Sequence, residues 1–84
     1  MLYYTYILRS TFGKYYIGQT SNLTERLNRH NSGRSRFTKS RGPWELAYSE
    51  TFNTREEAIR REQELKRRHS RGLPIPAPGE SVQG

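Results

Sequence analysis

The 84-residue sequence contains no cysteine, and all eight of its acidic residues are Glu. Without cysteine the chain can form neither a disulfide nor a zinc site built on thiolates. This composition fits a reducing compartment, and we expect a cytoplasmic protein. A metal site built on carboxylates has only those eight candidates. No segment approaches the roughly 18 consecutive apolar residues of a membrane span, and residues 1–9 lack the pattern of a signal peptide.

Positive charge, by contrast, is abundant. The chain has 15 bases against eight acids, and 12 of the bases are Arg. Because a guanidinium group can bind phosphate in a bidentate manner, this bias favours phosphate recognition over solubility alone. A chain of this length makes at most one domain, and it buries only roughly 60–65% of the surface of its unfolded state.

Much of this charge gathers in residues 33–43, which read G-R-S-R-F-T-K-S-R-G-P. The segment has four bases, one aromatic residue and no acid. Such a composition suggests an edge that faces phosphates, and the alternative is a solvated, flexible loop. The candidate nucleic-acid-binding residues in this segment are Arg34, Arg36, Lys39 and Arg41.

The N-terminal part of the chain predicts a β-hairpin. Residues 2–9 are rich in aromatic and β-branched side chains, as strands are. A loop over residues 10–13 then leads to a second strand over residues 14–18, which pairs antiparallel with the first. This pairing puts Tyr6 opposite or diagonal to Tyr16, and a slip of one residue would change the face on which each lies.

A third strand is predicted over residues 44–51. Apolar and polar side chains alternate there, which is typical of a strand with one buried face. The alternation places three large side chains on one face, and these are Trp44, Leu46 and Tyr48.

Two helices have recognisable N-termini. Asn22 and Thr54 are good N-cap residues, and each is followed three residues later by a Glu, as in a capping box. Those acids are Glu25 and Glu57.

The first helix carries a polar pair beside its apolar stripe. Leu23 and Leu27 are four residues apart and share one face. At about 100° per residue, His30 falls beside them and Arg26 lies at the edge of the stripe. Both side chains are therefore expected to project toward whatever the two leucines bury against.

The second helix has few apolar residues, namely Ala58, Ile59 and Leu65. In the helical projection Glu62 falls between Ala58 and Ile59, near the middle of the apolar face. A carboxylate left dry and unpaired there would cost several kcal/mol. We therefore expect Glu62 either to pair with an Arg or to hold a metal ion.

The C-terminal segment has a different composition. The second helix should fray near His69, to which we assign no role, and the domain is expected to cover residues 1–71. Residues 72–84 hold three of the four prolines of the chain and no base. We expect them to form a disordered or loosely docked tail that the domain does not need for folding.

Five residues from these elements can converge, although each alone has an ordinary structural explanation. Tyrosines pack in cores, an Arg or a Glu forms ion pairs, and a His near a helix end is stabilised by the helix dipole. Together they provide the groups for phosphodiester hydrolysis: a carboxylate for a hard cation, an Arg for the transition-state charge, and a Tyr or His to deprotonate water. The five are Tyr6, Tyr16, Arg26, His30 and Glu62.

At these positions the sequence resembles the GIY-YIG endonucleases. The second half-motif is intact as Y-I-G at residues 16–18, and the first reads Y-T-Y, with Tyr4 in place of the leading Gly. The run over residues 18–31 looks like the family's helix. The run A-x-x-R-E-x-x-L-K over residues 58–66 looks like its metal-binding segment.

The resemblance covers residues 3–68. Within the family, the sequence most resembles the small stand-alone bacterial branch, which is close to the nuclease domain of the excision-repair incision subunit. It implies an α+β fold in which helices flank a small three-stranded antiparallel sheet. It also implies cleavage of DNA with Mg²⁺ or Mn²⁺ bound at Glu62. Some members of the family add a late Asn, and this chain has none after Asn53.

The resemblance also implies a role for each of the other site residues. Tyr6 would be the general base for water, assisted by His30. Tyr16 would orient the phosphate or the water, and Arg26 would contact the scissile phosphate.

Three hypotheses follow. The first is a metal-dependent endonuclease acting on DNA, with repair or recombination as its setting, and the second is a non-catalytic nucleic-acid-binding module. The third is an interaction domain recruited by a protein partner. An inward Glu favours the first, because binding alone has no use for it. We expect a monomer that binds DNA and no membrane, with any sequence or structure specificity supplied by another protein.

Overall fold

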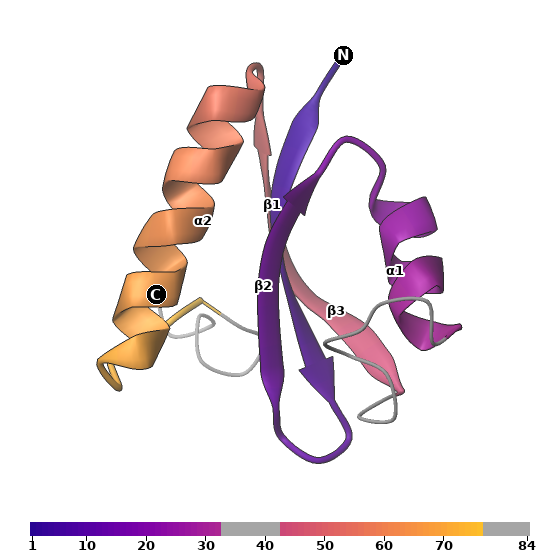
Figure 1. Ribbon diagram of the computed structural model, residues 1–84, viewed down its shortest axis with the longest axis vertical. Helices are drawn as coiled ribbons and strands as arrows, with labels where there is room; N and C mark the ends of the chain where they lie inside the picture. Colours follow the sequence, from indigo (N-terminus) through magenta and orange to yellow (C-terminus); the bar gives the residue numbers. More distant parts are fainter. Residues whose placement is uncertain (33–42, 77–84) are drawn as a thin grey trace.

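The computed structural model describes residues 1–32 and 43–76. It is an α+β fold in which a three-stranded antiparallel sheet has strand order β2-β1-β3. Helix α1 lies on one face of the sheet and helix α2 on the other (Figure 1). This architecture confirms the predicted fold class. The elements are β1 (Tyr3–Ser10), β2 (Tyr15–Thr20), α1 (Leu23–Asn31), β3 (Trp44–Phe52) and α2 (Arg55–Ser70).

Strand β1 is central and is covered on both sides, so its residues from Thr5 to Leu8 are buried without interruption. Its alternate side chains belong to two separate cores. Ile7 packs on the α2 side, with Ile17 and Leu65 among its neighbours. Tyr6 and Leu8 face the other way, toward Trp44 and the leucines of α1.

The register between β1 and β2 places Tyr6 opposite Gly18 and Leu8 opposite Tyr16. The two tyrosines are therefore diagonal neighbours on one face, which is one of the two predicted arrangements. The hairpin loop supports this register. The Ser10 hydroxyl accepts the backbone N–H groups of Phe12 and Lys14, and Gly13 has a φ of 79°.

Strand β3 departs from the predicted alternation. Its register with β1 shifts between the Ile7 and Leu8 pairs, so that Ile7 lies opposite Tyr48 and Leu8 opposite Leu46. The β-bulge adds one residue to β3. As a result Ala47 and Tyr48 both pack on the α2 side. The prediction that Trp44, Leu46 and Tyr48 share a face is wrong for this reason.

Both helices begin where their caps predict. The Asn22 side chain accepts the backbone N–H of Glu25, and the Thr54 hydroxyl accepts that of Glu57. The first capping box is incomplete, however. The backbone N–H of Asn22 bonds to the Thr20 hydroxyl instead of a Glu side chain.

The end of α1 is tied directly to the start of β3. The side chain of Asn31 donates to the backbone carbonyl of Trp44 at 3.0 Å and accepts the backbone N–H of Trp44 at 2.7 Å. This double contact holds the last turn of α1, including His30, against the sheet. Neither helix within the described ranges is long and apolar enough to cross a membrane.

Part of the expected tail belongs to the core. Helix α2 ends at Ser70, and the chain turns back through Gly72, whose φ is 73°. Ile75 is 6% exposed and packs with Leu65 in the core on the α2 side. The folded part of the described chain therefore continues past the expected boundary at residue 71, because Ile75 is buried in this core. Residues 77–84 lie outside the described part of the chain.

We predict that Ile75→Ala lowers the free energy of unfolding by about 2–5 kcal/mol, the usual cost of truncating a buried Ile. The matched control is Leu73→Ala, because Leu73 is 45% exposed and its loss should change stability by less than about 0.5 kcal/mol. Urea unfolding of both variants provides the measurement. Equal stabilities of the two variants would show that the Ile75 contact contributes nothing.

Candidate active site

Tyr6 occupies the centre of the candidate site. Its side chain is 1% exposed on the α1 face of the sheet, directly across from Gly18. A Cβ atom added to Gly18 would lie 2.7 Å from the Tyr6 hydroxyl oxygen and 3.1 Å from a ring carbon of Tyr16. Glycine at this position therefore provides the space in which the two rings lie.

His30 completes a cluster of three rings. It is 3% exposed at the end of α1, and its Nε2 atom lies 3.3 Å from the Tyr6 hydroxyl oxygen. The centroids of the Tyr16 and His30 rings are 4.5 Å apart, and those of Tyr6 and Tyr16 are 6.3 Å apart. The prediction that residues from β1, β2 and α1 converge thus holds for these three.

The environment shifts the pKa values of Tyr6 and His30 in opposite directions. Burial raises the pKa of the Tyr6 hydroxyl, and Tyr16 adds to the rise while Arg26 opposes it. Burial also lowers the pKa of His30, and the positive charges of Arg26 and Arg29 lower it further. At neutral pH the hydroxyl therefore keeps its proton, and the imidazole is uncharged and able to accept one.

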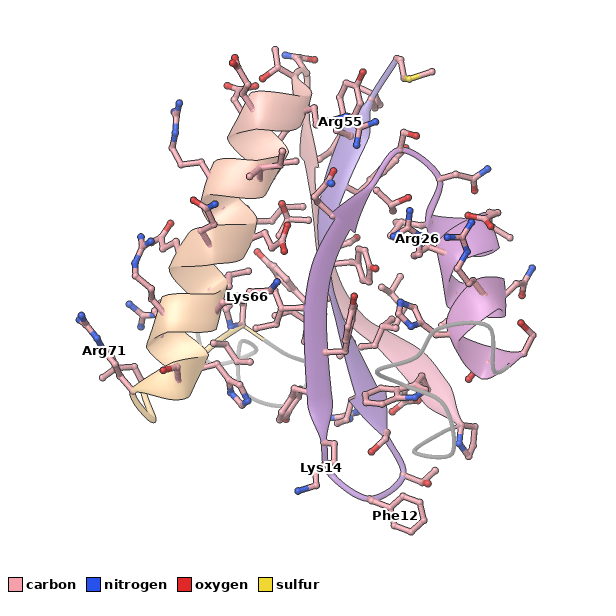
Figure 2. The ribbon with its side chains drawn as sticks, viewed as in Figure 1. Phe12, Lys14, Arg26, Arg55, Lys66 and Arg71 are labelled. Atoms are coloured by element: carbon pink, nitrogen blue, oxygen red, sulfur yellow. The ribbon has the colours of Figure 1, made fainter. Side chains whose placement is uncertain are left out.

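Arg26 projects from α1 beside this cluster (Figure 2). Its Nε atom is buried and makes no hydrogen bond with any part of the described chain. The Glu25 carboxylate lies 4.0 Å from that atom, but it pairs more closely with Arg29, at 3.1 Å. A guanidinium group held in this way has donor capacity for an anion placed next to Tyr6.

Glu62 approaches from the other helix. Its side chain is 17% exposed on α2, and one carboxylate oxygen lies 2.6 Å from the Lys66 ammonium one turn later. Of the two predicted alternatives, pairing with an Arg is not what the described residues show, because the ion-pair partner of Glu62 is Lys66. The Glu62 charge contributes to the raised pKa of Tyr6, although it is the weakest of the five influences on that hydroxyl. The carboxylate thus acts on the ring cluster electrostatically, from α2 on the opposite side of the sheet.

The protein groups near Glu62 fit only one kind of metal site. Residues 1–32 and 43–76 contain no group of three His or Glu side chains that could hold a metal together. Mg²⁺ is commonly bound through one or two carboxylates, with waters and substrate phosphates completing its shell. Glu62 fits this pattern as a single anchor, and a cation there would replace Lys66 as its partner.

Four of the five candidate catalytic residues lie on the α1 face of the sheet, and Glu62 alone comes from α2. The candidate nucleic-acid-binding residues Arg34, Arg36, Lys39 and Arg41 lie outside the described part of the chain.

Two residues were missed by sequence reasoning. The importance of Gly18 follows from its register with Tyr6, which sequence leaves uncertain by one position. Lys66 could have been found, because Glu and Lys four residues apart on a helix form a favourable pair.

Comparison with known proteins shows which sequences and structures this chain is similar to. The family model for the GIY-YIG catalytic domain matches residues 2–73 of this chain. A UPF0213 protein of Streptococcus agalactiae is 41% identical over 66 residues, which cover 77% of this chain and 75% of that protein. A UPF0213 protein of Streptococcus pneumoniae is 42% identical over 66 residues, covering 77% of this chain and 67% of that protein.

The fold has a counterpart of known structure. The solution NMR structure of a UPF0213 protein from Bacillus halodurans is 36% identical in sequence, with a TM-score of 0.51. The match covers 86% of this chain and 80% of the other. From the family match, the similar bacterial sequences and the shared fold, we conclude that this chain belongs to the GIY-YIG family of nuclease domains.

Proposed function

We propose that this protein is a metal-dependent endonuclease that hydrolyses phosphodiester bonds in DNA. The observation that carries the proposal is the buried Nε of Arg26, which has no hydrogen-bond partner within the described residues. It lies beside a Tyr hydroxyl and an uncharged His in hydrogen-bond contact. A buried donor left unsatisfied costs about 1–3 kcal/mol, a cost that a bound phosphate would remove.

The Tyr6–His30 contact gives a route for the proton of the attacking water. Because its pKa is raised, Tyr6 is a hydroxyl rather than a phenolate at neutral pH. It can accept a proton from water only as it releases its own, and His30 Nε2 at 3.3 Å is the acceptor in reach. This relay requires the His30 tautomer that carries its proton on Nδ1. The water oxygen then attacks phosphorus, and the bond to the leaving oxygen breaks.

Arg26 stabilises the charge that develops on the phosphoryl oxygens. A preorganised donor in a site that excludes water is worth more in the transition state than in solution. The same positive charge helps to keep His30 unprotonated before the reaction. Tyr16, whose ring packs beside those of Tyr6 and His30, orients the phosphate or the water.

Glu62 is the residue that would hold Mg²⁺ or Mn²⁺. When bound, such an ion supplies Lewis-acid stabilisation of the phosphate and of the leaving oxygen. Until then Lys66 neutralises the Glu62 carboxylate at 2.6 Å, so that the protein does not carry an uncompensated charge at a largely covered position.

A plasmid-nicking assay tests the proposal directly. Wild-type protein should nick DNA with Mg²⁺ or Mn²⁺ and not with EDTA, and Glu62→Gln should abolish nicking while the fold survives. Gln is nearly isosteric, and the Lys66 ammonium left behind is 54% exposed and can turn to solvent. The matched control is Glu64→Gln, which removes a surface carboxylate paired with Arg61 on the same helix and should nick normally.

Thermal melts with and without Mg²⁺ separate catalysis from folding in these variants. Mg²⁺ should raise the melting temperature of wild type but not of Glu62→Gln. A Glu62→Gln protein that still nicks would contradict the role of this carboxylate. Wild type that binds DNA but nicks no form of it would favour the non-catalytic binding module.

Gly18→Ala tests the space available to the ring cluster. The new methyl group would meet the Tyr6 hydroxyl at 2.7 Å and must displace it from His30. Because a misplacement of about 1 Å can cost roughly 10²-fold in rate, we expect nicking to fall by about that factor. The neighbouring variant Gln19→Ala provides the control, and amide NMR spectra report whether the fold is kept. Normal nicking by Gly18→Ala would show that the Tyr6 position is not critical.

The lowered pKa of His30 predicts how activity and stability vary with pH. In the unfolded chain His30 titrates near 6.5, and in the folded protein it titrates lower. Between these two values the unfolded state binds more protons, so stability rises with pH through that window. The contribution is complete above 6.5 and is lost as pH falls through the folded-state value.

Nicking should fall only as the pH drops through the lowered folded-state pKa of His30, because a protonated imidazole cannot accept the Tyr6 proton. Ring NMR titration of His30 gives its pKa, and urea unfolding of wild type and His30→Gln at several pH values gives the stability difference. A His30 ring that titrates at or above 6.5 in the folded protein would contradict this prediction.

A further inference from the structure

A concave site borders the ring cluster at Tyr16, between β2 and α2. It has a volume of about 300 Å³ and is lined by Tyr15, Tyr16, Ile17, Lys66 and His69. This volume is at the lower end of the range of roughly 300–1,000 Å³ for small-ligand sites. Figure 2 shows Lys66 between α2 and β2. Tyr15 and His69 have no role in the proposed catalysis.

One wall of this depression is aromatic and joins two elements that are far apart in sequence. The rings of Tyr15 and His69 meet edge to face, with centroids 5.8 Å apart. Tyr15 is partly buried and packs against the core on the α2 side, which fixes the wall in place. His69 is exposed, so its ring presents an accessible surface at the end of α2.

The rest of the lining connects the depression to the candidate active site. Tyr16 borders it and also contacts the His30 ring at 4.5 Å between centroids. Lys66 supplies a positive charge and holds the Glu62 carboxylate at 2.6 Å. An aromatic wall and a cation therefore lie beside two residues of the proposed catalytic set.

We propose that this depression is a subsite for an unpaired nucleotide adjacent to the phosphate that is cleaved. Its base would stack on the wall formed by Tyr15 and His69, and Lys66 would contact its phosphate. The inference rests on the proposed function and narrows its substrate to DNA with a single-stranded nucleotide at the cleavage position. Aromatic side chains beside a cation are the means by which proteins hold single strands, whereas a base inside a duplex has no free face to offer.

Binding without cleavage provides the test. The full chain is titrated with the single-stranded tetranucleotide of thymidylate in EDTA and is observed by NMR. The ring resonances of Tyr15 and His69 should shift on addition of the tetranucleotide. A fully paired blunt-ended duplex should leave these ring resonances unchanged, because its bases are already stacked on one another.

Variants then separate stacking from general attraction of charge. His69→Ala should weaken binding of the tetranucleotide at least about fivefold, the low end for loss of a base–aromatic stack, and should leave duplex binding unchanged. The matched control is Arg67→Ala, because Arg67 is an exposed basic residue two positions earlier on α2. This variant should weaken binding of the tetranucleotide and of the duplex slightly and equally. If the ring resonances do not move, or if the two variants behave alike, the subsite is excluded.

The outcome is independent of whether the protein cuts DNA. If the Tyr15 and His69 ring resonances shift but the protein nicks no DNA, the subsite is supported and only the endonuclease proposal fails. If the protein nicks DNA but the tetranucleotide does not shift the Tyr15 and His69 ring resonances, the subsite is overturned and the proposed function stands.

Discussion

The arrangement of the site depends on the register of a single hairpin, in which Tyr6 lies opposite Gly18. A slip of one residue would turn each side chain of β2 to the other face of the sheet, because side chains alternate along a strand. Tyr16 would then enter the core on the α2 side. The hydroxyl of Ser10 and the positive φ of Gly13 determine the turn, and Gly18 provides the room for Tyr6.

The same register explains why the ring cluster behaves as one unit. Tyr6 is shielded by its neighbours, which raises its pKa, and His30 is shielded by the same packing, which lowers its own. Arg26 acts on both groups in the direction that disfavours positive charge on His30 and favours ionisation of Tyr6. Changing one member therefore alters the other two, so the effects of single variants in this cluster should not add.

Much of the fold could be predicted from local signals. The N-caps at Asn22 and Thr54 each depend on one side chain and one nearby backbone group, and both helices begin there. The alternation along β1 and the helical spacing of Arg26 and His30 led to the correct convergence of Tyr6, Tyr16 and His30. These signals span only a few residues and do not need knowledge of the rest of the structure.

What sequence reasoning missed depends on contacts between distant segments. The bulge in β3 changes which face Tyr48 occupies, and no residue in that strand signals it. Ile75 lies in a proline-rich segment typical of a tail, but its burial depends on contact with Leu65 and the rest of the core on the α2 side, which lie far from it in sequence or in another element. The depression at Tyr15 and His69 joins residues more than 50 positions apart, so no local pattern could predict it.

The ion pair between Lys66 and Glu62 has a consequence for how such a small domain can be made and kept. A protein that relied on a metal to neutralise an inward carboxylate would unfold whenever the metal was scarce. Here the helix carries its own neutralising cation one turn away, on a flexible stem that can withdraw toward solvent. Folding is thereby separated from metal supply, and under the proposed function a scarcity of divalent ions would stop catalysis without unfolding the protein.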